Sequence, residues 1–151
     1  EGGCVDFTGN EDIDSWEKIT DEVRVCTGIR RLLDAGVSEN NFTISSDGQG
    51  SLPRFSPSGP YEGLGIGKAS SLLKEVRECV MREHLPLELA LRAITSNPAR
   101  ILKLNTKGHI APGYDGDICL LHKDSLLLHT VIAKGRVMVR NSVPEVRGTF
   151  E

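Results

Sequence analysis

The sequence has 151 residues, of which 38% are hydrophobic and 26% are charged, and this is the composition of a globular domain rather than a disordered chain. Its 18 Lys and Arg residues against 21 Asp and Glu residues give a formal net charge of −3, which excludes the basic footprint of a typical nucleic-acid-binding protein. No apolar run approaches the roughly 18 residues that a membrane-spanning helix needs, so neither nucleic acid nor a membrane is an expected partner.

Apolar periodicity predicts alternating strands and helices at the start of the chain. Short apolar or β-branched runs predict strands at residues 3–7 and 42–46. Between them, apolar residues at spacings of i, i+4, i+7 and i+8 predict a helix over 21–35, with Gly36 as its C-terminal cap. The Pro and Gly residues of 47–61 predict a loop.

Further helices are expected along the middle of the chain. The first covers residues 68–83, and the second covers 86–95 with Pro86 as its first residue. Asn97 and the proline that follows it predict a cap and the start of a short helix that ends at residue 102. The alternation of strand and helix predicts parallel βα units.

The pattern changes after residue 104. Turn signals become frequent, and short strands are expected at 118–122, 130–134 and 136–140, with Lys134-Gly135 as a tight hairpin. The sequence therefore predicts an α/β region over residues 1–104 and a small β region over 105–151.

Neither the cysteines nor the histidines have the spacing of a metal site. No two of the four cysteines form a Cys-x-x-Cys pair, and the four histidines form neither His-x-His nor His-Glu-x-x-His. We therefore expect reduced, structural cysteines in a cytoplasmic protein and no histidine ligand in this chain.

The segment 63–68 (GLGIGK) resembles a phosphate-binding loop at first sight. Glu62 stands where the first glycine of that motif belongs, and Ala69 stands where Ser or Thr should follow the lysine. The segment is therefore interpreted as a flexible loop that enters a helix.

Asp47 is the first candidate for chemistry. The segment 44–51 (ISSDGQGS) places it at the end of a predicted strand, followed by glycines and by Ser51. In βα architectures active sites form at such strand ends, where a carboxylate binds a metal or accepts a proton. The same residues also fit an Asp-Gly turn whose carboxylate bonds to local backbone, and the local sequence leaves both alternatives open.

Five segments together resemble the isoaspartyl dipeptidases of the amidohydrolase superfamily. Segments 45–51 (SSDGQGS) and 147–151 (RGTFE) are similar to the dipeptidases themselves. Three further segments resemble the C-terminal part that members of the superfamily share: 95–102 (TSNPARIL), 107–117 (KGHIAPGYDGD) and 131–139 (VIAKGRVMV).

The resemblance implies a fold and a site. Residues 1–104 would be the last part of a (β/α)8 barrel, with strands seven and eight and the helices after them, and 105–151 would supply strands of a small β-sandwich domain. Asp47 would bind one of two zinc ions and act as the catalytic general base, while Ser51 would help to hold a carboxylate of the substrate.

The same resemblance implies a larger enzyme. The His-x-His pair, the carboxylated lysine and the two further histidines that hold zinc in the superfamily have no counterpart in this sequence, so we expect a C-terminal fragment that is inactive alone. Its parent would hydrolyse isoaspartyl dipeptides as a cytoplasmic homo-oligomer.

The alternatives are an inactive remnant that acts as a binding or assembly module, and an amidohydrolase that acts on a cyclic amide. An incomplete barrel should expose the helix face of Leu72, Leu73 and Val76, and the isolated chain should aggregate or be partly molten.

Overall fold

The computed structural model describes residues 3–10, 13–17, 21–56 and 58–148. Its internal contacts divide the chain into two units, Glu1–Pro98 and Ala99–Glu151, and each unit is described by itself. The last three residues of the tail motif lie outside the described residues. In the described part of the chain, no helix is long and apolar enough to cross a membrane.

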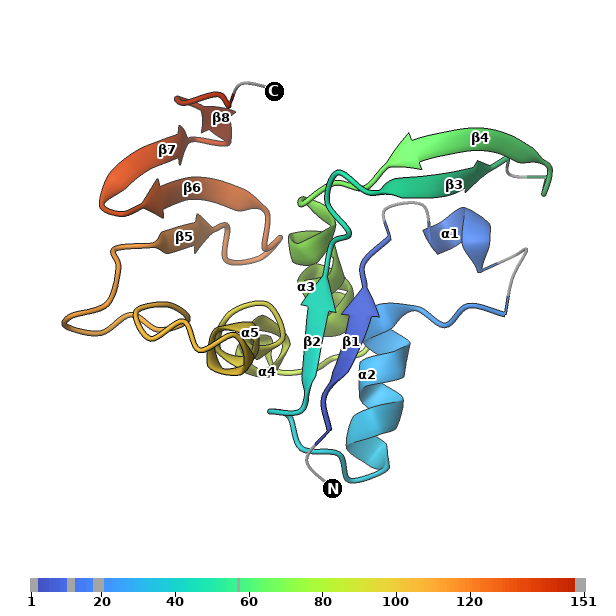
Figure 1. Cartoon of the computed structure of the whole chain (residues 1–151), viewed down its shortest axis with the longest axis horizontal. Helices are drawn as coiled ribbons and strands as arrows, with labels where there is room; N and C mark the ends of the chain where they lie inside the picture. Colours follow the sequence, from blue (N-terminus) through green and yellow to red (C-terminus); the bar gives the residue numbers. More distant parts are fainter. Residues whose placement is uncertain (1–2, 11–12, 18–20, 57, 149–151) are drawn as a thin grey trace. The chain divides into compact units, whose positions relative to one another are not determined.

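Two neighbouring parallel strands form the centre of the first unit, and the chain passes through a helix on its way from the first strand to the second (Figure 1). The strands are β1 (Val5–Thr8) and β2 (Phe42–Ser45), and the helix is α2 (Val25–Asp34), so the predicted βα order is confirmed. The ring of Phe7 lies against Gly28 of α2, where an added Cβ atom would come within 2.6 Å of the ring. A glycine inside a helix reduces stability, but here it lets the helix approach the strand closely.

Helix α2 begins four residues later than the predicted helix 21–35 and ends within one residue of the predicted end. It buries Val25, Cys26 and Ile29 on one face, in keeping with the apolar spacing of the sequence. Gly36 has a φ of +80°, and its amide donates to the carbonyl of Leu33 at 2.9 Å. A left-handed residue at this position terminates the helix, and glycine adopts it without steric cost.

The later helices are α3 (Ser71–Met81), α4 (Leu87–Arg92) and α5 (Ser96–Ile101). Pro86 lies just before α4 as its N-cap and is not its first helical residue. Asn97 was expected as a cap, but it lies inside α5 and its side chain is buried. Its amide donates at 2.8 Å to the carbonyl oxygens of both Glu39 and Phe42, so it ties α5 to the chain that enters β2.

The core of the first unit lies between β2 and the helices. Phe42 and Ile44 of β2 alternate with half-exposed residues, and they pack with residues of α2, α3 and α4. Val76 is fully buried in this cluster, while Leu72 and Leu73 pack partly buried against it. The expectation that this face of α3 is exposed is therefore wrong, because β2 and the neighbouring helices cover it.

A β-hairpin follows β2 where a loop was expected. It consists of β3 (Ser51–Phe55) and β4 (Tyr61–Ile66), which pair antiparallel. The prediction of a loop over 47–61 and of a flexible loop over 63–68 is wrong for these residues. Pro53 and the glycines of β4 suggested a loop, but within the described part of the chain the two strands pair with no others, and unpaired edges tolerate proline.

The second unit contains one antiparallel sheet with the strand order β5-β6-β7-β8. Its strands are β5 (Ile118–Leu121), β6 (Leu128–Ala133), β7 (Arg136–Arg140) and β8 (Val143–Pro144), and the last of these was not predicted. Lys134 and Gly135 have φ angles of +47° and +76°, as a tight two-residue hairpin turn requires. Among the described residues of the second unit there is this single sheet, so the β-sandwich stays a prediction.

Candidate functional site

Asp47 lies directly beyond the carboxyl end of β2, where the sequence placed it. The strand ends at Ser45, and Asp47 is exposed with a φ of +45°, a left-handed conformation that Asp tolerates better than most residues. The structure therefore presents a carboxylate at the tip of a parallel strand, which is the position that active-site residues occupy in βα folds.

Backbone hydrogen bonds fix the turn that carries Asp47. The amide of Gly50 donates to the carbonyl of Asp47 at 2.8 Å, and the amide of Gly67 donates to the carbonyl of Gly50 at 2.8 Å. The amide of Gln49 completes the closure by donating to the carbonyl of Gly67 at 2.9 Å. The end of β4 therefore holds the turn from one side.

Glycine is required at two positions of this turn. A Cβ atom on Gly67 would overlap the carbonyl oxygen of Asp47, and one on Gly50 would lie 2.6 Å from a carboxylate oxygen of Asp47. Side chains at these positions would move either the backbone or the carboxylate. The glycines that made the segment look like a loop therefore set the position of the Asp47 side chain.

Ser51 opens β3 and is exposed. It pairs with Ile66 across the hairpin, so the turn and the hairpin hold it four residues from Asp47.

The described residues do not complete a metal centre. Within the described ranges, no three side chains of His, Cys, Asp or Glu come together as a group able to hold a metal ion. A structural or catalytic zinc site uses three or four protein ligands, and Asp47 supplies one carboxylate. All four cysteines are free, and burial raises the pKa of the Cys26 thiol and raises that of Cys79 to about 12, so both remain protonated.

Asp6 is a second exposed carboxylate of the strand pair, and no pattern in the sequence identifies it. Asp6 of β1 is exposed and accepts hydrogen bonds from the hydroxyl groups of Thr43 and Ser45, the latter at 2.6 Å. Thr43 and Ser45 point away from the core that Phe42 and Ile44 occupy, because side chains alternate along a strand. The face of the strand pair that leads to Asp47 is thus polar. This face forms only when β1 pairs with β2, so the sequence of either strand alone does not indicate it.

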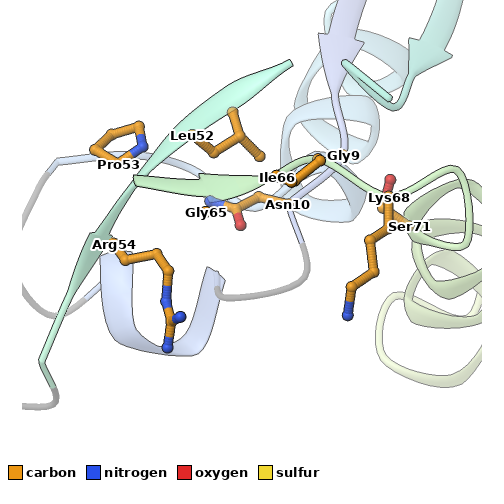
Figure 2. Close-up of a pocket in the computed structure, with 10 residues that line it drawn as sticks. Gly9, Asn10, Leu52, Pro53, Arg54, Gly65, Ile66, Lys68 and Ser71 are labelled. Atoms are coloured by element: carbon orange, nitrogen blue, oxygen red, sulfur yellow. The ribbon is translucent and has the colours of Figure 1, made fainter. Parts of the chain in front are cut away.

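A pocket of about 280 Å³ lies beside the Asp47 turn. Figure 2 shows its walls, which come from the residues after β1, from the β3–β4 hairpin and from the start of α3. The lining residues are Gly9, Asn10, Leu52, Pro53, Arg54, Gly65, Ile66, Gly67, Lys68 and Ser71. Gly67 belongs both to this pocket and to the Asp47 turn.

The chain after β1 is tied to α3 by two contacts at Asn10. The backbone amide of Asn10 donates to the Glu75 carboxylate at 3.2 Å, and its carbonyl accepts from the Lys74 ammonium at 3.4 Å. Glu75 is buried, and this burial raises the pKa of its carboxyl group above the ordinary value. One wall of the pocket is therefore held by a buried acid.

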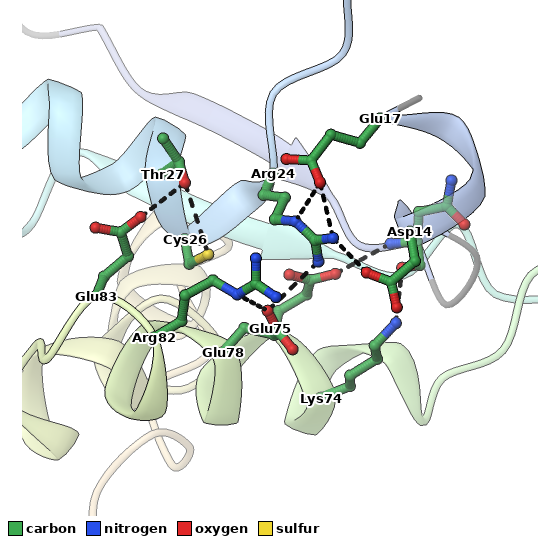
Figure 3. Close-up of polar contacts among 11 residues, drawn as sticks. Asp14, Glu17, Arg24, Cys26, Thr27, Lys74, Glu75, Glu78, Arg82 and Glu83 are labelled. Carbon is green, nitrogen blue, oxygen red and sulfur yellow. Dashed lines mark hydrogen bonds and ion pairs between the residues drawn. The ribbon is translucent and has the colours of Figure 1, made fainter. Parts of the chain in front are cut away.

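Arg24 anchors the segment beyond Asn10, which includes α1 (Ile13–Trp16). Its buried guanidinium pairs with Asp14, with Glu17 at 2.8 Å and with Glu78 of α3 at 3.5 Å (Figure 3). Hydrogen bonds from Arg24 hold the pKa values of Asp14 and Glu17 below their ordinary values. The cluster is interpreted as structural support for the chain that follows β1.

Comparison with known proteins assigns the chain to a family. Residues 12–141 match the amidohydrolase family. The chain belongs to the amidohydrolase family. The resemblance drawn from the sequence motifs is therefore confirmed.

The chain is similar to solved beta-aspartyl dipeptidases. One structure of the enzyme from Fervidobacterium islandicum AW-1, in complex with a beta-Asp-Leu dipeptide, is 35% identical, covers 98% of this chain and has a TM-score of 0.77. A second structure of that enzyme is 30% identical with a TM-score of 0.72, again over 98% of this chain. The chain spans 37% and 34% of the length of these two structures.

A more distant likeness concerns the fold alone. The N-acetylglucosamine-6-phosphate deacetylase of Pasteurella multocida is 18% identical, with a TM-score of 0.57 over 76% of this chain and 34% of its own. The corresponding enzyme of Thermotoga maritima is 19% identical, with a TM-score of 0.56 over 72% of this chain and 34% of its own. An α/β fold is therefore shared with these structures, whereas the partial barrel remains a proposal.

Proposed function

We propose that this chain supplies a catalytic carboxylate, Asp47, and a substrate-binding hydroxyl, Ser51, to a metal-dependent hydrolase of β-aspartyl dipeptides. The observation that carries the proposal is the position of Asp47 at the end of β2, on a turn closed by glycines. The likeness over 98% of the chain to an enzyme solved with a beta-Asp-Leu dipeptide supports the choice of substrate.

In the proposed reaction a water molecule attacks the carbonyl carbon of the isopeptide bond. Asp47 accepts a proton from that water and transfers it to the nitrogen of the leaving residue, so the carbon–nitrogen bond breaks and an aspartate and an amino acid are released. Ser51 donates a hydrogen bond to a substrate carboxylate and positions the dipeptide. The exposure of both residues at the end of the strand pair leaves them accessible to a substrate.

The chain spans little more than a third of the related enzyme, so the proposed activity belongs to a longer protein. The two zinc ions of this proposal would need ligands beyond the described residues, which offer no group of three ligands. In the proposed parent, β1 and β2 would be the seventh and eighth strands of a barrel whose interior covers the polar face of Asp6, Thr43 and Ser45. We further propose a cytoplasmic, homo-oligomeric parent.

The test is hydrolysis by the protein made from the complete reading frame and loaded with zinc. We expect release of aspartate from β-Asp-Leu and none from α-Asp-Leu. Hydrolysis of a cyclic amide such as dihydrouracil in place of β-Asp-Leu would favour the other amidohydrolase chemistry. Metal binding without hydrolysis of either compound would overturn the proposal in favour of a binding module.

A further inference from the structure

We propose that His122 and His129 of the second unit together bind one divalent transition-metal ion, with Thr130 as the residue that orients His129. The site is independent of the proposed function, because Asp47 and Ser51 lie in the first unit. His122 directly follows β5 and is exposed, and His129 is half-buried near the start of β6. The ring centroids of the two histidines lie 5.1 Å apart.

A bulge in the pairing of β5 with β6 brings the two rings together. The register shifts between Leu120 and Leu121, and His129 on β6 is the extra residue at this point. A bulge re-aims the side chain of the residue that it adds. Here the ring of His129 meets that of His122 at an interplanar angle of 80°. The sequence predicted no histidine ligand because this contact depends on strand pairing and not on local spacing.

The loop that joins β5 to β6 fixes the backbone of His122. The amide of His122 donates to the carbonyl of Leu127 at 2.9 Å, and its carbonyl accepts from the amide of Leu126 at 2.8 Å. Leu126 is 5% exposed, so a buried apolar side chain anchors the same loop. The imidazole of His122 is itself exposed, and its χ2 torsion is soft, so the ring turns towards an ion at little cost.

Thr130 selects the nitrogen of His129 that faces the ion. Thr130 is buried, and its hydroxyl oxygen lies 2.8 Å from Nδ1 of His129. When Nδ1–H donates to this hydroxyl, Nε2 carries the lone pair that a metal ion needs. Histidines that bind metals generally donate their other ring N–H to such a partner, which fixes the tautomer and the ring orientation. Among the described residues, Nε2 of His129 and the ring nitrogens of His122 have no hydrogen-bond partner.

The two imidazoles determine the class of ion. Imidazole nitrogen suits Zn²⁺, Ni²⁺ and Cu²⁺, whereas Mg²⁺ and Ca²⁺ prefer oxygen ligands. Two nitrogen ligands of one zinc ion lie at most about 4 Å apart, and rings with centroids 5.1 Å apart meet this limit after a turn about χ2. Within the described ranges, no His, Cys, Asp or Glu side chain joins the pair as a third ligand, so water fills the remaining positions.

A Zn²⁺ titration of the 151-residue chain tests the inference. Calorimetry would compare the unchanged chain with His122→Gln, Thr130→Val and the control His109→Gln. His109 is a matched control because it is an exposed histidine of the same unit that also lies against an aromatic ring. Loss of a group that orients a ligand costs about 10–100-fold in metal affinity, so we expect His122→Gln and Thr130→Val to weaken Zn²⁺ binding at least about tenfold. His109→Gln should bind as the unchanged chain does.

NMR of the histidine rings gives a second readout of the same site. The first equivalent of Zn²⁺ should shift the ring resonances of His122 and His129 together and leave those of the other two histidines in place, while Mg²⁺ should shift neither. This readout separates the histidine pair from ions held by the exposed cysteines.

Unchanged Zn²⁺ affinity in His122→Gln, or a shift confined to one of the two rings, would overturn the shared site. Since His122 is exposed, its replacement leaves the fold intact and this result is decisive. Unchanged affinity in Thr130→Val would overturn the role of Thr130, and an equal response to Mg²⁺ would show that carboxylates hold the ion.

Discussion

The turn that carries Asp47 leaves no room for a Cβ atom at two of its glycines. The carbonyl oxygen of Asp47 occupies the space that a Cβ atom of residue 67 would need, and a carboxylate oxygen lies near the space of a Cβ atom at residue 50. The sequence indicated loop at these glycines because glycine is common wherever the chain turns. The requirement for glycine at residue 67 comes from a contact across 20 positions of sequence, which local patterns do not contain.

Gly67→Ala should therefore destabilise the chain. Overpacking at a site that cannot relax costs about 1–3 kcal/mol in the free energy of unfolding, and here the added atom meets backbone rather than a flexible side chain. Gly3→Ala is the matched control, because no atom lies within 4 Å of its added Cβ atom. Urea unfolding of both variants measures the difference, and equal stabilities would show that the turn tolerates a side chain.

Glu75→Gln should stabilise the chain at neutral pH. Because burial raises the pKa of Glu75 in the folded state, its stabilising contribution is present below its ordinary pKa of 4.5 and is lost as the pH rises through the raised value. Glutamine keeps an oxygen that can accept the Asn10 amide, and it cannot ionise.

The gain should appear in urea unfolding at pH 7 and shrink towards pH 4. Glu88→Gln on the exposed side of α4 is the control, and its effect should stay within about 0.5 kcal/mol. A gain from Glu75→Gln that grows on acidification would contradict the sign of the pKa shift.

At the scale of elements, the periodic segments and the strands β5, β6 and β7 were predictable, whereas the β3–β4 hairpin was not. The strands β1 and β2 and the helices α2 and α3 carry apolar residues at the spacing of their own period, so the sequence located them to within a few residues. The β3–β4 hairpin has no such pattern, because it is held by pairing between its two strands and both its faces carry exposed residues.

Arg24→Gln should loosen α1 from the helices. The guanidinium is buried and pairs with three carboxylates on two segments, residues 13–17 and α3, but Asp14 and Glu17 are exposed to solvent, which screens the attraction. We expect a loss of about 1–2 kcal/mol in the free energy of unfolding and faster hydrogen exchange in residues 13–17.

The control is Arg31→Gln, which removes an exposed arginine of α2 and should change stability by less than about 0.5 kcal/mol. The difference should begin to shrink as the pH falls below the ordinary pKa values of Asp14 and Glu17, 3.8 and 4.5, and should be lost as the pH falls through their lowered folded-state values, because a lowered pKa contributes its full stability only above the ordinary one. Equal free energies of unfolding for the Arg24 variant and the unchanged chain at pH 7 would show that the ion pairs of Arg24 do not stabilise the fold.

At the scale of the molecule, the exposed apolar surface differs from the one expected. Val76 is buried, whereas Leu64 and Ile66 on one side of β4 are 66% and 67% exposed. Exposed apolar strands with unpaired edges recruit further strands. The polar site was predictable as the Asp47 motif, but Asp6, the pocket and the buried Ser71 depend on segments far apart in sequence, so the sequence did not reveal them.

The 151-residue chain should therefore self-associate through β4. Replacing Leu64 and Ile66 by lysine should shift it towards the monomer in size-exclusion chromatography with light scattering. Replacing Ile110, an 80% exposed residue outside the strands, by lysine should not. A monomeric unchanged chain with a sharp, cooperative thermal transition would contradict this prediction.

We propose Asp47 as the catalytic carboxylate of a β-aspartyl dipeptidase. Its most direct test is kcat for β-Asp-Leu in the zinc-loaded complete protein with Asp47→Asn. Asparagine keeps the volume but accepts no proton from water, and positioned general-base catalysis is worth about 10²–10⁴-fold. We therefore predict that kcat falls at least about a hundredfold while the fold is retained, whereas Ser51→Ala changes mainly KM. A near-normal kcat in Asp47→Asn, with metal still bound, would show that Asp47 is a turn residue and that the account is wrong.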